Sequence, residues 1–245
     1  MIYLISLGLH DRKDMSIRAI ETAKKCDKLY IERYTNFYRT SNSELGRLLG
    51  KKITELSREE MENGEKIIKE AKNNKVGIMI IGDALTATTH TSLILDAHKK
   101  GIKTEVIHGS SILTAVGETG LSLYKFGKTT SIPFAHQTVQ EPYNVIRSNN
   151  DMHTLILLDL RPGENKYMTT QEAINYLLEV EENRKDKVFL NETKVVIVAA
   201  LGGEKEIKYG KAVEMAKIKL KGVPQCLIVP GKLHFMEEEF LETYS

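Results

Sequence analysis

The segment Val76-Gly-Ile-Met-Ile-Ile-Gly-Asp83 is the clearest architectural signal in the chain. Its apolar run has the length of a buried strand, and the Gly-Asp pair marks the end of that strand. Apolar spacing then predicts a helix over Ser92–Lys100, closed by Gly101, and a second strand over Lys103–Ile107. A strand, a helix and a strand in this order are typical of a βαβ unit with parallel strands.

The same alternation extends from this unit toward both ends of the chain. A capping box, Ser57-Arg-Glu-Glu60, predicts the start of a helix that continues to about Asn73. Further strands are predicted at Ile2–Leu7, Lys28–Ile31, Thr129–Ile132, His153–Leu160, Lys194–Leu201 and Cys226–Val229. Further helices are predicted at Ser16–Lys25, Ser43–Leu49, Thr170–Glu182, Lys205–Leu220 and Glu237–Thr243. This pattern predicts an α/β fold with largely parallel sheets.

The predicted strands fall into two groups of four, which indicates two α/β lobes. We place the boundary in Leu-Ser-Leu-Tyr-Lys-Phe-Gly-Lys, residues 121–128. The N-terminal lobe would then contain residues 1–122 and the C-terminal lobe residues 123–245. Open parallel sheets bind ligands beyond the carboxyl ends of their strands, and ligand pockets are common between domains. We therefore expect a ligand in the crevice between the lobes.

Length and charge exclude several classes of protein. The 245 residues carry a formal net charge of +2, which is too small to indicate a nucleic-acid-binding protein. No apolar run approaches the roughly 20 residues of a membrane-spanning helix, and the N-terminus lacks the basic start of a signal peptide. Cys26 and Cys226 are too few for a disulfide scaffold. We therefore expect a cytoplasmic protein that binds neither membrane nor nucleic acid.

The chain lacks the short motifs of several common enzyme classes. There is no G-x-G-x-x-G after the first strand, no P-loop, no H-E-x-x-H, no C-x-x-C and no G-x-S-x-G. These absences argue against phosphoryl transfer, zinc hydrolysis and acyl transfer. The 7 His residues lack metal-ligand spacing, so no metal is expected, and His108 is interpreted as a hydrogen-bonded residue at a strand end. What remains is chemistry that depends on a bound cofactor or on positioning.

Four loops next to strands carry the features of a ligand site. They are Ser6–Asp11, Gly82–His90, His108–Gly117 and Pro224–His234, and the first three mix Gly with small or hydroxylated residues. Glycine lets the backbone approach a ligand closely, and Ser and Thr offer hydroxyls without bulk. These stretches resemble the tetrapyrrole-methylase superfamily, the class III methyltransferases with a two-lobed α/β fold. The resemblance implies S-adenosyl-L-methionine in the cleft between the lobes and S-adenosyl-L-homocysteine as the product.

Within this superfamily the chain is similar to the diphthine synthase family. The similarity rests on the ordered set LGLHDRKD, GDALTATTH, IHGSSILTAVGETGL, YKFGKTT, HTLILLDL and LIVPGKLH, which extends from Leu7 to His234. Ala84 departs from the pattern, since a Pro often follows the Gly-Asp pair. The resemblance implies methylation of the amine of a 3-amino-3-carboxypropyl group on a modified histidine of translation elongation factor 2. The product would be diphthine, an intermediate of diphthamide biosynthesis, and the enzyme would be a homodimer.

The resemblance also assigns cofactor-binding positions, one residue at a time. They are Leu9, Asp83, Thr86, Ser111, Ile112, Leu158, Leu201 and Gln225. Asp83 would accept a hydrogen bond from a cofactor amine or hydroxyl; the alternative is a purely structural helix cap. The leucines would offer backbone contacts to the cofactor or, alternatively, belong to the core. Gln225 stands where the family's pattern often has His, and no residue is assigned as catalytic.

Methyl transfer to an amine fits a chain without an evident acid–base group. The reaction creates no oxyanion, and alignment of the reactants can lower the barrier by up to about 7–11 kcal/mol. An α-amino group with its ordinary pKa near 8 is about one-tenth neutral at pH 7, so no strong base is required. Two alternatives stay open. One is the same fold acting on a tetrapyrrole or ribosomal RNA, and the other is a non-catalytic nucleotide-binding module.

Overall fold

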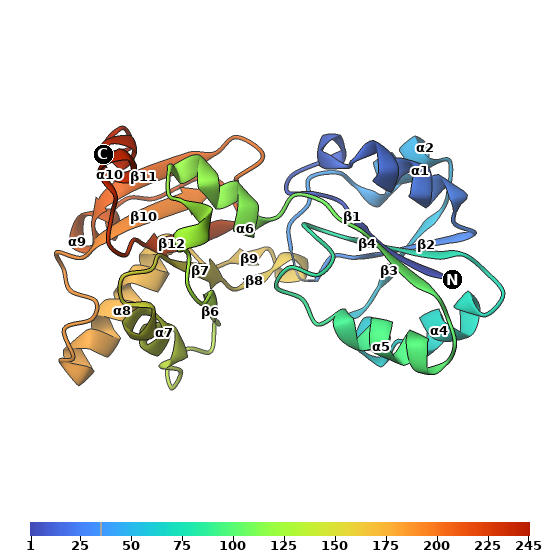
Figure 1. Cartoon of the computed structure of the whole chain (residues 1–245), viewed down its shortest axis with the longest axis horizontal. Helices are drawn as coiled ribbons and strands as arrows, with labels where there is room; N and C mark the ends of the chain where they lie inside the picture. Colours follow the sequence, from blue (N-terminus) through green and yellow to red (C-terminus); the bar gives the residue numbers. More distant parts are fainter. Residues whose placement is uncertain (35) are drawn as a thin grey trace. The chain divides into compact units, whose positions relative to one another are not determined.

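The computed structural model describes residues 1–34 and 36–245. The chain folds into two compact units, Met1–Leu113 and Thr114–Ser245, which we call the N-lobe and the C-lobe (Figure 1). The sequence interpretation put the boundary between residues 122 and 123. Each lobe contains a five-stranded sheet with helices packed on it. The α/β class expected from the sequence is therefore confirmed.

The strands of the N-lobe sheet pair in parallel, as the sequence predicts. Their order is β3-β2-β4-β1-β5, and Ile2 pairs with Val76 on one side and with Thr104 on the other. The strands are β1 (Ile2–Ser6), β2 (Lys28–Glu32), β3 (Ile53–Leu56), β4 (Val76–Ile80) and β5 (Thr104–Ile107). The sequence did not predict β3, because Leu56 is its one buried residue and this short edge strand shows no clear alternation.

Helices cover both faces of the N-lobe sheet. In Figure 1, α1 and α2 lie on one side and α4 and α5 on the other. Successive strand side chains point to opposite faces. Ile5 and Met79 therefore pack with α1 and α2, whereas Leu4 and Ile78 pack with α4 and α5. The helices are η1 (Arg12–Asp14), α1 (Ile17–Lys25), α2 (Asn42–Leu49), α3 (Arg58–Asn63), α4 (Glu65–Ala71) and α5 (Thr91–Lys99).

The single helix predicted from Ser57 to about Asn73 is in fact two helices. The capping box is present: Ser57 Oγ accepts from the Glu60 amide, and the Glu60 carboxylate accepts from the Ser57 amide. Gly64 then takes a left-handed conformation with φ of +65°, which ends α3 and begins α4. Glycine adopts this conformation without the penalty that a Cβ brings, so a Gly inside a helical pattern can end the helix.

The C-lobe sheet is mostly antiparallel, so the expectation of largely parallel sheets is wrong for this lobe. Its strand order is β11-β10-β12-β7-β6. Strand β10 is antiparallel to both β11 and β12, β12 is antiparallel to β7, and β6 pairs with β7 in parallel. The strands are β6 (Thr130–Ile132), β7 (Thr154–Leu158), β10 (Lys194–Ala199), β11 (Glu206–Lys211) and β12 (Gln225–Val229).

The helix predicted over Lys205–Leu220 is wrong, since this segment forms β11 and the short helix α9 (Ala212–Met215). In β11, Ile207 and Tyr209 are buried and Lys208 between them is exposed, which is the two-residue period of a strand. A turn with positive φ at Gly202 precedes it, and β11 then pairs back on β10. The Gly-Gly pair at 202–203 between two strand-like runs signals a hairpin more directly than the helical spacing signals a helix.

The main C-lobe core contains residues of the sheet and of helices α7 and α8. Tyr143 of α7, Leu177 of α8 and Ile197 of β10 are fully buried in it. The remaining elements are α6 (Ile112–Ala115), η2 (Val116–Thr119), η3 (Leu123–Lys125), α7 (Glu141–Asn149), β8 (Leu160–Arg161), η4 (Pro162–Glu164), β9 (Lys166–Tyr167), α8 (Thr170–Arg184) and α10 (Phe235–Glu242). No helix in the described residues combines the length and the apolar character needed to cross a membrane.

Candidate functional site

The carboxyl ends of β4, β1 and β5 form the candidate site in the N-lobe. These strands are parallel neighbours in the sheet, so the loops that follow them meet at one edge. Gly8 and Gly82 exchange backbone hydrogen bonds there, with N–O distances of 3.2 and 2.8 Å. Both have φ of +82°, which glycine adopts freely and other residues rarely do. The two glycines therefore let the loops after β1 and β4 pack directly against each other.

Small residues bring the loop after β5 equally close. A Cβ at Gly109 would lie 2.7 Å from the Ser6 Cβ, closer than any side chain tolerates. Ser6 Oγ accepts from the Ala84 amide at 2.9 Å. By contrast, a Cβ at Gly82 would meet nothing within 4 Å. This sheet edge thus combines tightly packed loops with open space beside the Gly82 backbone, an arrangement that suits a ligand held close to the main chain.

Asp83 joins the loops after β4 and β5 through a carboxylate that is nearly buried. Its Oδ1 accepts from the Leu85 amide at 3.0 Å and lies 3.4 Å from Thr86 Oγ1. Its Oδ2 accepts from the Gly109 amide at 3.1 Å and lies 2.9 Å from His108 Nδ1. Burial would raise the pKa of Asp83, but the two amides and His108 outweigh burial and lower that pKa below its ordinary value. Asp83 is therefore ionised at neutral pH.

His108 has one ring nitrogen in contact with protein, while most of the ring is open to solvent. Its side chain is 70% exposed although Nδ1 lies against the Asp83 carboxylate. An ionised carboxylate can only accept hydrogen bonds, so Nδ1 carries the proton and the neutral ring has its lone pair on Nε2. The interpretation of His108 as a hydrogen-bonded residue at a strand end is confirmed. The identity of its partner, Asp83, comes from the fold.

The structure gathers five of the predicted cofactor residues at this edge: Leu9, Asp83, Thr86, Ser111 and Ile112. Leu9 and Thr86 are half-buried in the loops after β1 and β4, Ser111 is buried, and Ile112 begins α6. The Thr86 amide donates to the Asp83 carbonyl at 3.1 Å and closes a turn. The strand order places these residues together, and their contact with a cofactor stays a prediction.

The other three predicted residues, Leu158, Leu201 and Gln225, meet at one edge of the C-lobe sheet. Leu158 ends β7 and Leu201 follows β10, whereas Gln225 begins β12 and pairs with Ala199 of β10. Because β12 is antiparallel to both neighbours, its amino end lies beside their carboxyl ends. All three residues are buried. Their grouping follows from the antiparallel pairing, and their binding role stays a prediction.

Gln225 uses both ends of its side-chain amide inside the C-lobe. Its Oε1 accepts from the Thr170 amide at 2.9 Å, and its Nε2 donates to the Gly222 carbonyl at 3.0 Å. These bonds connect the first residue of α8 with the segment before β12. Gln225 therefore has a structural role in the C-lobe. A contact with a ligand would be an additional role.

A buried pair, Glu32 with His90, supports the loop after β4, and sequence reasoning did not find it. Glu32 is completely buried at the end of β2, and its Oε2 lies 3.4 Å from His90 Nε2. His90 Nδ1 lies 3.0 Å from the Ala84 carbonyl oxygen, so both ring nitrogens face acceptors. Burial lowers the pKa of His90, but Glu32 outweighs burial and raises it. The sequence signal for a buried partner is the acidic residue Glu32 directly after the apolar run Leu29–Ile31.

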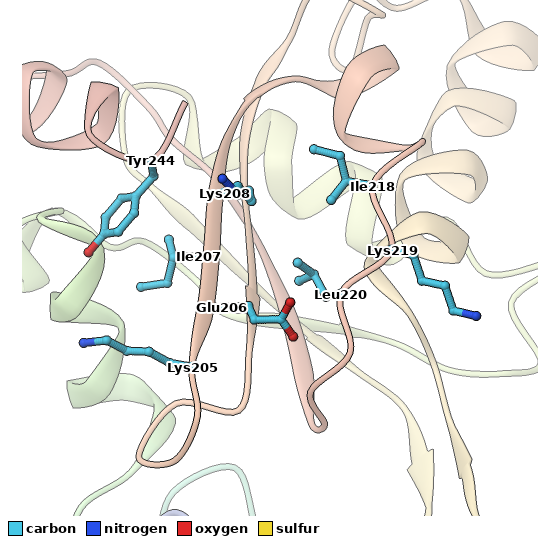
Figure 2. Close-up of a pocket in the computed structure, with 8 residues that line it drawn as sticks. All are labelled: Lys205, Glu206, Ile207, Lys208, Ile218, Lys219, Leu220 and Tyr244. Atoms are coloured by element: carbon cyan, nitrogen blue, oxygen red, sulfur yellow. The ribbon is translucent and has the colours of Figure 1, made fainter.

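A hollow of about 330 Å³ lies beside β11 in the C-lobe (Figure 2). Its walls come from the start of β11, from the segment before β12 and from Tyr244. Lys205 is ion-paired with Glu118, and Glu206 Oε1 accepts from the Gly222 amide at 2.8 Å. The described residues that line the hollow include none of the predicted cofactor residues, so we do not assign it as the site.

The chemical character of the N-lobe edge restricts its ligand. Residues 6–9, 82–86 and 108–112 include no Lys or Arg, so these loops offer no lysine or arginine to pair with a phosphate. They do offer the Thr86 hydroxyl oxygen and the open space beside Gly82, next to the ionised Asp83. Over residues 1–34 and 36–245, no group of three or more His, Cys, Asp or Glu side chains could hold a metal ion. The edge suits a ligand with amine and hydroxyl groups and without phosphate.

The chain matches a known protein family over most of its length. The sequence pattern that describes Tetrapyrrole (Corrin/Porphyrin) Methylases matches residues 1–216. A diphthine synthase of Methanocaldococcus jannaschii is 44% identical over 251 residues, which cover 99% of this chain and 98% of that protein. A diphthine synthase of Methanococcus maripaludis is 41% identical, with 99% of this chain and 98% of that protein covered.

Solved structures agree with the sequence matches. A crystal structure of diphthine synthase superposes with a TM-score of 0.91 at 35% sequence identity. The superposition covers 100% of this chain and 95% of that one. The similarity therefore includes both lobes and the loops of the two sheet edges.

Proposed function

Because the chain belongs to the diphthine synthases of the tetrapyrrole methylase family, we propose that it methylates translation elongation factor 2. It is an S-adenosyl-L-methionine-dependent methyltransferase of diphthamide biosynthesis. The proposed acceptor is the amine of the 3-amino-3-carboxypropyl group on a modified histidine of that factor, and the product is diphthine. The observation that carries the assignment is the 44% identity with a diphthine synthase over 99% of the chain.

We propose that the N-lobe edge binds S-adenosyl-L-methionine, with Leu158, Leu201 and Gln225 contributing from the C-lobe. The ligand has amine, hydroxyl and carboxylate groups and no phosphate, which agrees with loops that contain no Lys or Arg. When bound, it supplies an electrophilic methyl group. The open space beside Gly82 and the half-buried Thr86 lie in the loop after β4, and Asp83 connects that loop to the loop after β5.

The main contribution of these residues to the reaction is alignment. The Gly8–Gly82 backbone bonds, the Ser6–Ala84 bond and the Asp83 carboxylate together restrain the loops after β1, β4 and β5. A ligand bound to restrained loops has few orientations, and well-aligned reactants gain rate from that restriction. Since no oxyanion develops, the reaction needs no array of donors aimed at one.

We also propose that the protein acts in the cytoplasm as a homodimer, as the resemblance implies. The alternatives have less support. Phosphate backbones bind proteins mainly through basic groups, and a net charge of +2 with no Lys or Arg in the candidate loops argues against ribosomal RNA. The curated relatives at 41% and 44% identity are both diphthine synthases, which argues against a tetrapyrrole acceptor and against a non-catalytic module.

Intact mass spectrometry of elongation factor 2 tests the proposal. The substrate is the factor that already bears the aminocarboxypropyl-histidine, incubated with the protein and S-adenosyl-L-methionine. We expect the mass of three methyl groups to be added, and none in a control factor whose histidine is replaced. An additional methyl group would indicate that the carboxylate is methylated too. Unchanged mass, with cofactor binding established by calorimetry, would contradict the proposed acceptor.

A further inference from the structure

We propose that His108 is the general base that takes the proton from the acceptor amine before methyl transfer. The inference rests on the proposed function, because it takes the acceptor to be an amine. It gives a chemical role to a residue that the sequence interpretation treated as a hydrogen-bonded strand end.

The contact with Asp83 orients the His108 ring for this role. Its Nδ1 lies 2.9 Å from Asp83 Oδ2, and the Leu85 and Gly109 amides hold the same carboxylate from other directions. The ring can therefore present Nε2, with its lone pair, to a ligand. A carboxylate behind Nδ1 also stabilises the imidazolium that forms when Nε2 takes up a proton. Asp plays this part behind the histidine of serine hydrolases.

His108 has access to a ligand as well as orientation. Its side chain is 70% exposed, and it begins the loop that continues through Ser111 to Ile112. The exposed Nε2 leaves room for an amine to approach it directly or through one water molecule, as general-base catalysis requires. His90, which follows the loop after β4, is unsuitable because it is buried and both its nitrogens face acceptors, on Glu32 and Ala84.

A base at this position would increase the neutral fraction of the acceptor amine. An amine acceptor is mostly an ammonium at neutral pH, and each of the first two methyl transfers again leaves a protonated nitrogen. The N–H bond breaks, its electron pair stays on nitrogen, and the proton goes to Nε2. That electron pair forms the new N–C bond while the donor's C–S bond breaks, and the C–S pair stays on sulfur. Nε2 then releases the proton to solvent, so complete N-methylation removes three protons.

Two carboxylates near these loops are already engaged, whereas the His10 ring, in the loop after β1, is a second imidazole close to this edge. Asp14, in the loop after β1, accepts from the amides of His10 and Asp11 at 2.6 and 3.3 Å. Glu32, at the end of β2, is paired with His90. Asp83 is the acidic group in hydrogen-bond contact with the His108 ring.

The test compares the pH dependence of methylation by the full chain and two variants. His108→Asn keeps an N–H donor near the Nδ1 position, so it can retain the bond to Asp83 while removing the base. We expect kcat to fall by up to about 10-fold near pH 7, because about one-tenth of an amine with an ordinary pKa is still neutral there without a base. The difference in kcat between this variant and the wild type should become smaller toward about pH 9, where the amine is mostly neutral without a base. The control His98→Ala removes an exposed histidine of α5 and should leave the profile unchanged.

Two readouts separate chemistry from structure. Calorimetric titration with S-adenosyl-L-homocysteine should give nearly equal affinities for wild type and His108→Asn, and nitrogen NMR should find the Nδ1–H tautomer at His108. If kcat of His108→Asn were lower than that of the wild type by the same factor at every pH, His108 would not be the base. The same conclusion would follow if the variant had the same pH–rate profile as the wild type. If the wild type itself binds the cofactor but transfers no methyl group, the proposed function fails and the base with it.

Discussion

At the scale of single residues, the N-lobe edge depends on positions that lack a side chain. Gly8, Gly82 and Gly109 allow three loops to approach one another, and Asp83 then ties two of these loops together. Gly82 differs from the other two because the space where its Cβ would stand is open. It is therefore the position at which packing of the protein and binding of a ligand can be separated by experiment.

The substitution Gly82→Ala should weaken cofactor binding more than it weakens the fold. The added methyl group meets no protein atom, so the loss of unfolding free energy comes from the strained φ of +82° and should be about 1–2 kcal/mol. The same methyl group fills the open space beside the backbone. We expect the affinity for S-adenosyl-L-homocysteine to fall by at least about 10-fold, or 1.4 kcal/mol. Denaturant unfolding and calorimetric titration measure the two effects.

Gly101→Ala is the matched control for this prediction. Gly101 has φ of +69° and open space at the Cβ position, but it follows α5 rather than β4. Its replacement should lower stability by a similar amount and leave the affinity unchanged. If both variants bound the cofactor as well as the wild type does, the open space beside Gly82 would not be part of the site.

At the scale of elements, a buried carboxylate connects the end of α8 with the segment that follows it. Glu181 accepts from the Tyr143 hydroxyl at 2.6 Å and from the amides of Lys187, Val188 and Phe189 at 2.7, 2.7 and 2.9 Å. Burial would raise the pKa of Glu181, but these four donors outweigh burial and lower the pKa to about 2. The bonds place the fully buried Phe189 in the C-lobe core.

The substitution Glu181→Gln should destabilise the protein in a pH-dependent way. The folded-state pKa of about 2 is below the ordinary value of 4.5, so the stabilisation is present above pH 4.5 and is lost as the pH falls toward 2. At pH 7 we expect a loss of about 2–4 kcal/mol, because an amide nitrogen cannot accept from the donors around it. The difference in unfolding free energy between variant and wild type should be smaller near pH 3 than at pH 7, as measured by denaturant unfolding at both pH values.

Glu182→Gln provides the control on the same helix, since Glu182 is exposed. Its stability should follow that of the wild type at both pH values. If the difference in unfolding free energy between Glu181→Gln and the wild type were the same at both pH values, ionisation of this carboxyl would not be what stabilises the segment.

At the scale of the whole molecule, binding of the proposed cofactor should stabilise the folded chain. A ligand that binds the folded chain alone stabilises it by mass action, by about 2.7 kcal/mol at 100 times its Kd. For a chain of 245 residues this corresponds to a rise in Tm of roughly 5–10 °C. We expect S-adenosyl-L-homocysteine to produce this rise in a thermal scan of the full chain.

Adenosine triphosphate is the control ligand, because the candidate loops offer no lysine or arginine for its phosphates. It should change the Tm little at the same concentration. An equal rise with both ligands would contradict a site that discriminates against phosphate, and no rise with either would contradict the proposed cofactor.

Local sequence features were sufficient for the class of fold and for most of its elements. The apolar run Val76–Ile81, the Gly-Asp pair and the capping box at Ser57 act over a few residues, so their effects can be recognised without knowing the partner segments. The ordered motifs from Leu7 to His234 likewise indicated the family, and the matches over the full chain confirm it. The helix break at Gly64 and the hairpin at residues 202–203 had local signals too, but these competed with helical spacing.

Other features depend on contacts between segments far apart in the chain. The antiparallel pairing of β12 places Gln225 beside the ends of β7 and β10, and the strand order β4-β1-β5 places Asp83 against His108. The partner of Glu32 is likewise a histidine 58 positions further along the chain. The segments around these residues do not identify the partner, because register and strand order are set by the packing of whole faces of a sheet. The sequence therefore supplied the candidate residues, and the folded chain supplied their partners.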